Sequence, residues 1–460
     1  MSEESELTKK SEKFFYKVLD YPKSLIFVGF LLFFLSAISI PKLTQDTSID
    51  SFLSTSDSVR VQRDAIKEAF GLDDPMAIVV TNKNDIFNPK SLNLVKWLSE
   101  EASKIEGIDP EKITSLATEK NIEGVEGGMN ITPFYESEIE NQETANQVKN
   151  AVLDFPLFMG SLVGNDLKTT IIILETLNGA DNTKIYHDLI ELSKKAPTSG
   201  TNHIHIAGAG AVTGYLGEYI ASDAIRLNPI AAIIMTIILT LSFLTLRGTL
   251  LPNILILGAV GSTFGLMALT GIPFFTITSA LPGLLIAICI ADGIHILSAY
   301  YENISIYPDH SQKYIVSKAM GEMWRAVTLT SVTDIAGLLA IAATTNMPPM
   351  MYFGIFASYG VFVALFLSLT ILPGVLVKLK KKPSRLFQKG QTKGINALLS
   401  NTIKSFGKFV WNNEKLVLSF SVVIILVSLV GVFKIKINDE RIETFAKNEP
   451  IYKADKIINS

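Results

Sequence analysis

The stretch from Leu284 to Ile296 reads LLIAICIADGIHI and places a single acid, Asp292, inside an apolar run. A bilayer core needs about 20 apolar residues in a helix, and this run extends from Phe274 to Ala299. Inserting an acid at the centre of such a helix into the membrane costs roughly 2.5–3.5 kcal/mol of free energy. An acid at this position is therefore first interpreted as functional. The stretch therefore predicts a membrane-spanning helix that carries an ionisable group.

Six other apolar stretches are long enough for a similar helix. The seven expected spans are residues 24–40, 229–246, 250–270, 274–299, 326–344, 352–377 and 416–433. The first span also fits a signal peptide ending near Ser39, but its motif recurs later in the chain, where no signal could act. The chain is only 18% charged, against about 25% in soluble proteins. We expect a multi-pass α-helical protein of the cell (inner or plasma) membrane.

Charge and cysteine usage exclude other classes of protein. A net charge of -3 argues against nucleic acid as a partner, because nucleic acid selects strongly basic surfaces. The single cysteine, Cys289, excludes intrachain disulfides and a metal site built from cysteines.

Basic residues near the span ends predict the orientation of the chain. They gather before the first span, after the second and after the sixth: Lys9, Lys10, Lys13, Lys17, Lys23, Arg247, Lys378, Lys380, Lys381, Lys382, Arg385, Lys389 and Lys393. The turns at 271–273 and 345–351 carry no charge. We therefore expect a cytoplasmic N-terminus. The expected domains are a tail (1–23), a first span (24–40), an extracytoplasmic domain (41–228), a bundle (229–377), a basic linker (378–415), a seventh span (416–433) and the start of a second outer domain (434–460).

The segment between the first two spans has the pattern of a mixed α/β domain. Strand-like runs occupy 76–81, 113–118, 169–176 and 203–206, and helical periodicity covers 89–105, 136–153 and 182–195. Strands alternating with helices predict split βαβ, ferredoxin-like units.

The chain also repeats itself. Phe14, Val18 and Lys23 recur as Phe406, Val410 and Lys415, and Ile49–Phe52 recurs as Ile442–Phe445. The ordered set predicts a tandem repeat whose second copy occupies about the last 68 residues of the chain. We expect the rest of that copy, a C-terminal half of the same transporter, to be a partner of this chain, because tandem repeats of this kind build transporters with a working site between the halves.

A second acid, Asp334, lies in the fifth expected span. Asp292 and Asp334 lie eight and nine residues from Tyr300 and Arg325 at the same membrane face, a depth of about 12–14 Å for both. Two carboxyls at equal depth on successive helices could share a proton. His295, three residues from Asp292, and the hydroxyls of Thr330, Ser331 and Thr333 complete a predicted proton relay.

Plainer interpretations stay open for these residues. Either acid could be a structural hydrogen-bonding group, and His295 could bind a neighbouring helix. Hydroxyls in a span commonly bond to their own helix. Two stripes of small residues predict helix-packing faces: Gly283, Ala287 and Ala291, and Gly261 and Gly265. Pro282 predicts a kink in the fourth span.

Two motifs of the outer segment carry little weight. Gly208-Ala209-Gly210 follows a strand as a dinucleotide-binding turn would, but the third glycine, Gly214, comes one residue late. His203 and His205 share one strand face without a third ligand in view. We therefore expect no cofactor and no metal.

The run from Asp223 to Glu302 resembles the resistance-nodulation-division (RND) superfamily, and within it the hydrophobe/amphiphile exporters related to the mycobacterial membrane lipid transporters. The matching pieces are Arg226–Pro229, Arg247–Pro252, Leu269–Pro273, Ala291–Leu297, Tyr300–Glu302, Met323–Arg325 and Leu329–Thr333. The order of spans and domains matches over nearly the whole chain.

The resemblance implies a secondary transporter with no enzymatic activity. Asp292 would be the proton-carrying acid of an antiporter, and the outer domain would receive lipids or other hydrophobic or amphiphilic compounds. Family members have twelve spans and many are oligomers, so a homo-oligomer is a further expectation. Relatives more often carry threonine at the position of Asp334, so the role of this acid rests on its depth.

Two other functions fit the same layout. A Sec-type protein-export accessory would also use protons, but its loss would impair precursor secretion. A sterol-sensing-like lipid receptor would bind lipid without pumping and would tolerate the change Asp292→Asn.

Overall fold

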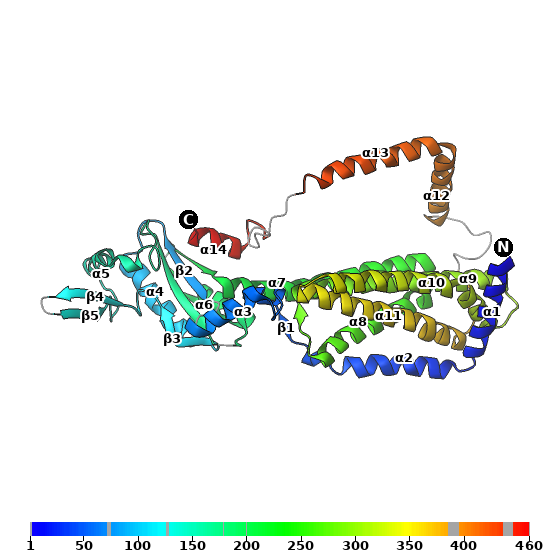
Figure 1. Ribbon diagram of the computed structural model, residues 1–460, viewed down its shortest axis with the longest axis horizontal. Coiled ribbons are helices and arrows are strands. Elements are labelled where there is room, and N and C mark those ends of the chain that lie inside the picture. The colour runs from blue at the N-terminus through cyan, green and yellow to red at the C-terminus, as the bar shows by residue number, and fades with distance from the viewer. Residues whose placement is uncertain are drawn as a thin grey trace. The chain divides into compact units, whose positions relative to one another are not determined.

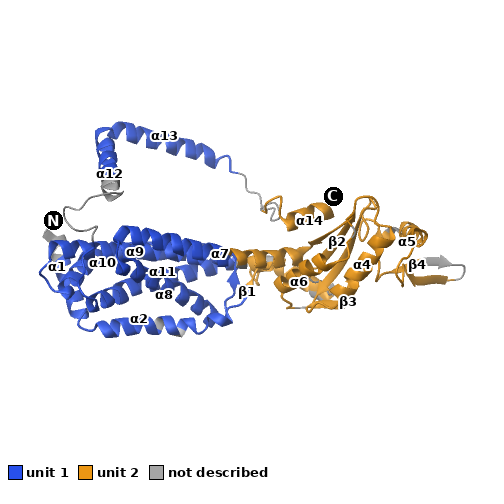
Figure 2. Ribbon diagram, turned by 180° about the vertical axis from the view of Figure 1, so that it is seen from behind, with its two compact units in different colours: residues 1–45, 224–439 blue, residues 46–223, 440–460 orange. Residues whose placement is uncertain are grey.

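The computed structural model describes residues 2–70, 75–125, 128–177, 179–198, 200–384, 395–435 and 445–459. Part of the basic linker and residues Ile442 to Thr444 of the repeat motif lie outside these ranges. The chain forms two compact units, Met1–Gln45 with Ala224–Asp439, and Asp46–Asp223 with Glu440–Ser460 (Figure 2). We call them the bundle unit and the α/β unit.

Helices make up the bundle unit (Figure 1). They are α1 (Ser2–Val18), α2 (Pro22–Ala37), η1 (Ile40–Lys42), the second part of α7 (Ala209–Phe243), α8 (Leu246–Thr270), η4 (Thr276–Ala280), α9 (Leu281–Ile306), α10 (Gln312–Thr344), α11 (Pro348–Lys378), α12 (Ile395–Asn412) and α13 (Glu414–Val432). The short strand β1 (Gln45–Asp46) follows α2 and η1 in the sequence, and the short strand β8 (Phe274–Phe275) directly precedes η4.

Capping residues set several helix ends. The side chain of Thr245 accepts a hydrogen bond from the Gly248 amide at the start of α8, and Gly271 ends that helix with φ 69°. Ser311 caps α10 in the same way, by accepting from the Tyr314 amide. Pro282 lies in the first turn of α9, where its missing amide hydrogen is not needed. The predicted kink at Pro282 stays a prediction; the residue lies where the span changes from η4 to α9.

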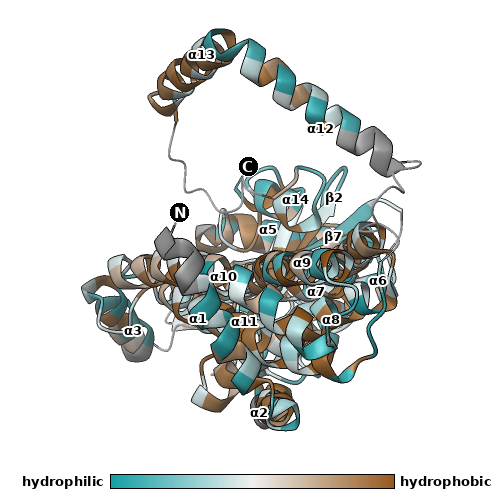
Figure 3. Cartoon of the chain, turned by 90° about the vertical axis from the view of Figure 1, so that its right-hand side faces the viewer, coloured by the Kyte–Doolittle hydropathy of each residue, from teal (hydrophilic) through white to brown (hydrophobic). Residues whose placement is uncertain are grey.

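By length and composition, six described helices could cross a membrane. They are Ala209–Phe243, Leu246–Thr270, Thr276–Ile306, Gln312–Thr344, Pro348–Lys378 and Glu414–Val432. The apolar part of α2, Pro22–Leu31, is shorter. Helix α13 is apolar after its first two residues, Glu414 and Lys415 (Figure 3). None of its residues is buried.

The core of the bundle unit lies between α8, α9, α10 and α11. Tyr300 and Tyr301 are its largest fully buried side chains. Their hydroxyls are satisfied by Gln312, which donates to Tyr300 at 2.7 Å, and by Thr245, 2.6 Å from Tyr301. Glycines allow close helix approach: a Cβ on Gly265 of α8 would overlap the backbone of Ser36 in α2.

The α/β unit contains a four-stranded antiparallel sheet in the order β3-β6-β2-β7, the order of a ferredoxin-like split βαβ fold. Its strands are β2 (Met76–Asn82), β3 (Ile108–Thr114), β6 (Thr169–Thr176) and β7 (Asn202–Ala207). The predicted fold class, a multi-pass helical protein with an inserted α/β domain, is confirmed. Strand β3 begins five residues before the predicted run, and a hairpin of β4 (Lys120–Val125) and β5 (Gly128–Pro133) was not predicted.

Helices cover both faces of this sheet. The helices of the unit are α3 (Ser58–Phe70), α4 (Pro89–Ala102), α5 (Gln142–Asp154), α6 (Asn182–Lys195), the start of α7 and α14 (Pro450–Ile458), with η2 (Ile49–Phe52) and η3 (Pro156–Phe158). Helices α4 and α6 pack with Met76, Ile78 and Val80 of β2. On the other face Val79 packs with Ala454 of α14. Strand β2 is a continuous apolar run because both of its faces are buried.

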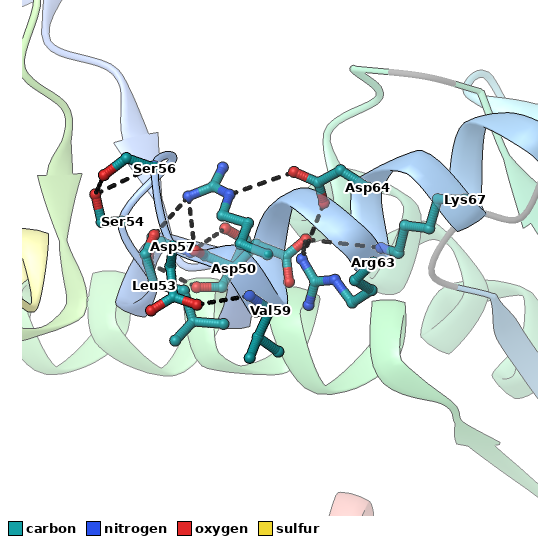
Figure 4. Close-up of polar contacts among 12 residues, drawn as sticks. Asp50, Leu53, Ser54, Ser56, Asp57, Val59, Arg63, Asp64 and Lys67 are labelled. Atoms are coloured by element: carbon teal, nitrogen blue, oxygen red, sulfur yellow. Dashed lines mark hydrogen bonds and ion pairs between the residues drawn. The ribbon is translucent and has the colours of Figure 1, made fainter.

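Helix α14 and helix α3 follow the two copies of the repeat motif, but their surroundings differ. Ile451 and Ala454 of α14 are buried against the sheet, and Tyr215 donates a hydrogen bond to Glu449 at 2.6 Å. In α3 the basic side chains hold the helix to the preceding turn, with Arg63 2.5 Å from the Asp50 carboxylate (Figure 4). Val59 of α3 is 64% exposed.

Candidate functional site

The acid singled out from the sequence lies inside the bundle unit. Asp292 occupies the middle of α9, and only 3% of its surface is exposed. Helix α10 packs along α9 and presents the fully buried Ser331 to it. The Ser331 hydroxyl lies 3.3 Å from Asp292 Oδ2 and 2.9 Å from the carbonyl oxygen of Val327, one turn earlier in α10. The structure thus joins two members of the predicted relay.

A hydroxyl between a carboxyl group and a backbone carbonyl can serve both protonation states. When Asp292 is ionised, Ser331 can donate its single proton to the carboxylate. When Asp292 is protonated, the same hydroxyl can donate to Val327 and accept from the acid. No backbone movement is required for this exchange, because both acceptors are already in place.

The second acid lies near the first, on the outer surface of α10. Asp334 is exposed and close enough to interact electrostatically with Asp292. Its position three residues after Ser331 turns it away from the α9 contact. In the described part of the chain, neither a hydrogen bond nor an ion pair joins the two acids.

His295 is separated from Asp292 although it lies three residues away on the same helix. Three residues turn a helix by about 300°, so the two side chains differ by about 60° in direction. That difference takes His295 out of the α10 contact and onto the exposed surface of α9. The spacing of three residues predicted that Asp292 and His295 share one helix face. In the structure Asp292 is buried and His295 is exposed, so the edge of the buried region lies between them.

Two of the predicted hydroxyls bond to their own helix. Thr330 donates to Ala326 and Val327 carbonyls at 3.1 and 2.9 Å, and Thr333 donates to Thr330 at 2.7 Å. Both side chains are exposed. Of the three hydroxyls expected in the relay, only that of Ser331 contacts Asp292 within the described residues.

The two stripes of small residues have different neighbours. Gly261 and Gly265 of α8 lie against Phe33 and Ser36 of α2. Gly283, Ala287 and Ala291 are exposed on α9, and a Cβ on Gly283 would meet nothing described within 4 Å. The exposed stripe runs on to His295, and together with Asp334 it forms what we call the open face of α9 and α10.

Sequence reasoning missed a polar cluster near the ends of α9 and α10. Asn303 donates to Glu322 at 2.8 Å, and Lys318 bridges Glu322 and Glu12 of α1 at 3.5 and 3.2 Å. These contacts fix α1 against α10. Glu322 and Lys318 are spaced i, i+4 in a helical run, which is the signal that could have revealed the pair.

The glycine motif given little weight has a structural role. Gly208 makes the turn from β7 into α7 at φ 97°, and a Cβ there would overlap the carbonyl oxygen of Pro75. Among the described residues, no group of three or more His, Cys, Asp or Glu side chains is placed to hold a metal ion.

Comparison with known proteins identifies the family of the chain. The sequence profile of the MMPL family matches residues 103–418, which include α7 to α11 and both acids. The chain belongs to the MMPL family. It is also 21% identical over 371 residues to a membrane protein of Methanocaldococcus jannaschii, covering 77% of this chain and 90% of that protein.

Membership of the MMPL family confirms the resemblance to the RND superfamily found in the sequence. It implies a transporter of the RND type and a multi-pass membrane protein. Asp292 and Ser331 both lie within the residues that match the family.

Proposed function

We propose that this MMPL chain exports lipids or other hydrophobic or amphiphilic compounds, driven by protons that bind and leave Asp292. The observation that carries the proposal is the buried Asp292 carboxyl with the Ser331 hydroxyl beside it, inside helices long enough to cross a membrane. The protein would act as a secondary transporter, without enzymatic chemistry and without a cofactor.

Protonation of Asp292 would change the charge buried between α9 and α10. A buried ionised carboxyl is costly, so the ionised and neutral forms favour different packing around it. The proton gradient supplies about 2.3 kcal/mol per charge for each 100 mV, which is enough to bias such an equilibrium. Ser331 would keep the acid hydrogen-bonded in both states.

The open face of α9 and α10 suggests the partner. A carboxyl and an imidazole that face lipid at this depth are unfavourable, and small residues allow a neighbouring helix to approach closely. Asp334, His295 and the Gly283 stripe would therefore be covered by a second half of the transporter or by another copy of the chain. Thr330 and Thr333 lie on the same exposed surface.

Basic residues give the proposed orientation. Lys23, Arg247 and Lys378 lie at the ends of helices α2, α8 and α11, and such residues favour the cytoplasmic side. The N-terminus would then be cytoplasmic and the α/β unit extracytoplasmic, where it would take up cargo.

Proton uptake into liposomes tests the proposal. The chain is reconstituted together with the partner proposed to cover its open face, with a pH-sensitive dye inside the liposomes, and a proton gradient is imposed for wild type, Asp292→Asn and Asp309→Asn. Asp309 lies between α9 and α10 outside both helices, so its change is a matched control. We expect uptake in wild type and Asp309→Asn and its loss in Asp292→Asn. Equal uptake in Asp292→Asn would refute the assignment, and no uptake in the folded wild type would favour a lipid receptor.

A further inference from the structure

An apolar groove opens between α2, α8 and α11 on the surface of the bundle unit. Its volume is about 220 Å³. Phe30 and Phe33 line it from α2, Ile254 and Leu257 from α8, and Leu367 and Ile371 from α11. Leu257 is 65% exposed, so the groove is open to its surroundings. It is separate from Asp292 and from the open face of α9 and α10, and nothing in the proposed function uses it.

Two glycines form the floor of the groove. A Cβ on Gly29 would overlap the side chain of Ile371, and a Cβ on Gly258 would lie 2.6 Å from Leu367 Cδ1. The helices approach each other closely at these points and leave no side chain to fill the space above. Glycine at these two positions therefore allows the helices that line the groove to approach closely.

The surroundings of the groove restrict what can fill it. All three helices are apolar, and α8 and α11 are long enough to cross a membrane. At that depth water finds no hydrogen-bond partner on an apolar wall, so a hydrocarbon chain is the natural occupant.

A basic residue lies seven positions from the groove on each of the three helices. Lys23 precedes Phe30, Arg247 precedes Ile254 and Lys378 follows Ile371. Seven residues make about two helical turns and 10.5 Å, so each basic residue lies on the same helix face as its groove residue.

The three basic residues lie at one end of the bundle unit. Gly374, in the last turns of α11, is adjacent to Pro22 at the start of α2. The Arg247 guanidinium, at the start of α8, donates to the carbonyl oxygen of Lys380 just after α11. Lys23 and Lys378 are exposed and make no ion pair with any residue in the described ranges. The groove thus has an apolar body and one cationic end.

We propose that this groove holds one acyl chain of an anionic membrane phospholipid, whose phosphate lies between Lys23, Arg247 and Lys378. A phospholipid has an anionic headgroup joined to a hydrocarbon chain. The headgroup matches the cationic end of the groove, and the hydrocarbon chain matches its apolar body. Anionic lipids are attracted to basic residues at a membrane surface. The bound lipid would hold α2 against α8 and α11.

Native mass spectrometry tests the acyl-chain part. The full chain is purified from membranes containing equal amounts of phosphatidylglycerol and phosphatidylcholine. We expect wild type to keep one phosphatidylglycerol with at least a tenfold preference. The change Leu257→Trp fills the groove and should abolish retention. The matched change Leu241→Trp, at a 60% exposed leucine of α7 that does not line the groove, should leave retention intact.

The headgroup part has its own test. The double change Lys23→Gln with Lys378→Gln should reduce the tenfold preference to near unity. Lys404→Gln with Lys408→Gln removes the same charge from exposed residues of α12 and should preserve the preference. Retention unchanged in Leu257→Trp, or no preference in wild type, would overturn the proposal. A disulfide-linked dimer formed by Leu257→Cys in place of lipid retention would assign the groove to a second copy.

Discussion

Ser331 Oγ lies 3.3 Å from the Asp292 carboxylate in the interior of the bundle unit, and both side chains are buried. The two residues come from different helices, 39 positions apart. Because Ser331 also reaches Val327 in its own helix, it can exchange hydrogen-bond partners without a movement of α10. This contact makes Asp292 a better candidate for a proton carrier than an acid held by several fixed donors would be.

The change Ser331→Ala should slow proton movement without unfolding the protein. A hydrogen bond to a charged group contributes about 1.5–3 kcal/mol, and 1.4 kcal/mol corresponds to about a tenfold change in rate. We expect proton uptake in liposomes to fall about tenfold or more. Ser331→Thr keeps the hydroxyl and should retain most of the activity. Full activity in Ser331→Ala would mean that the contact is only structural.

The two acids should respond differently to neutralisation. Asp292 is buried beside Ser331, whereas Asp334 is exposed on the open face. We expect Asp292→Asn to abolish proton uptake and Asp334→Asn to reduce it only in part, measured in the same liposomes. If Asp334→Asn were as severe as Asp292→Asn, the two carboxyls would have to work as one unit.

The two glycine stripes should differ in their effect on stability. A methyl group at Gly265 would overlap the Ser36 backbone, so Gly265→Ala should destabilise the bundle by about 1–3 kcal/mol. Gly283 has free space, and alanine there should stabilise the helix by up to about 1 kcal/mol. Unfolding of both variants in detergent micelles checks this. A loss of stability in Gly283→Ala would reveal a neighbour that contacts the open face.

The position of the proton-carrying candidate could be predicted from the sequence, but its partners could not. Asp292 is visible as an acid in an apolar run, and Ser331 was included only for its spacing from Asp334. Which face of α10 meets α9 depends on the packing of all the helices. Ser331 and Asp334 are only three positions apart on α10, yet the first is buried and the second is exposed. The same limit applies to His295.

The pattern of apolar residues predicted a strand correctly where both faces of the strand are buried, and failed where the strands are largely exposed or polar. The apolar run of β2 predicted its strand because both faces are covered. The hairpin of β4 and β5 was missed because its strands are largely polar, with Lys120 and Asn130 among them. Small residues at helical spacing occur in both α8 and α9. Gly261 and Gly265 lie against α2, whereas a Cβ on Gly283 would meet nothing described within 4 Å. Spacing shows that a helix can be approached closely, and packing decides whether it is.

Acid should loosen α14 from the sheet of the α/β unit. Burial, with smaller effects of His203 and Lys453, lowers the pKa of His205 below its usual 6.5. A histidine with a lowered pKa binds fewer protons in the folded state, so stability is full above about 6.5 and is lost as pH falls from there through the lower folded-state pKa. Lys453 lies in α14, so protonated His205 would repel that helix in particular.

Hydrogen exchange of residues 450–458 measures this loosening. After correction for the intrinsic pH dependence, we expect weaker protection at pH 5.5 than at pH 7.5. His205→Gln should remove the difference, because glutamine does not titrate. His187→Gln changes an exposed histidine of α6 and should leave the difference in place. If protection in His205→Gln still fell with pH, another group would control the contact between α14 and β7.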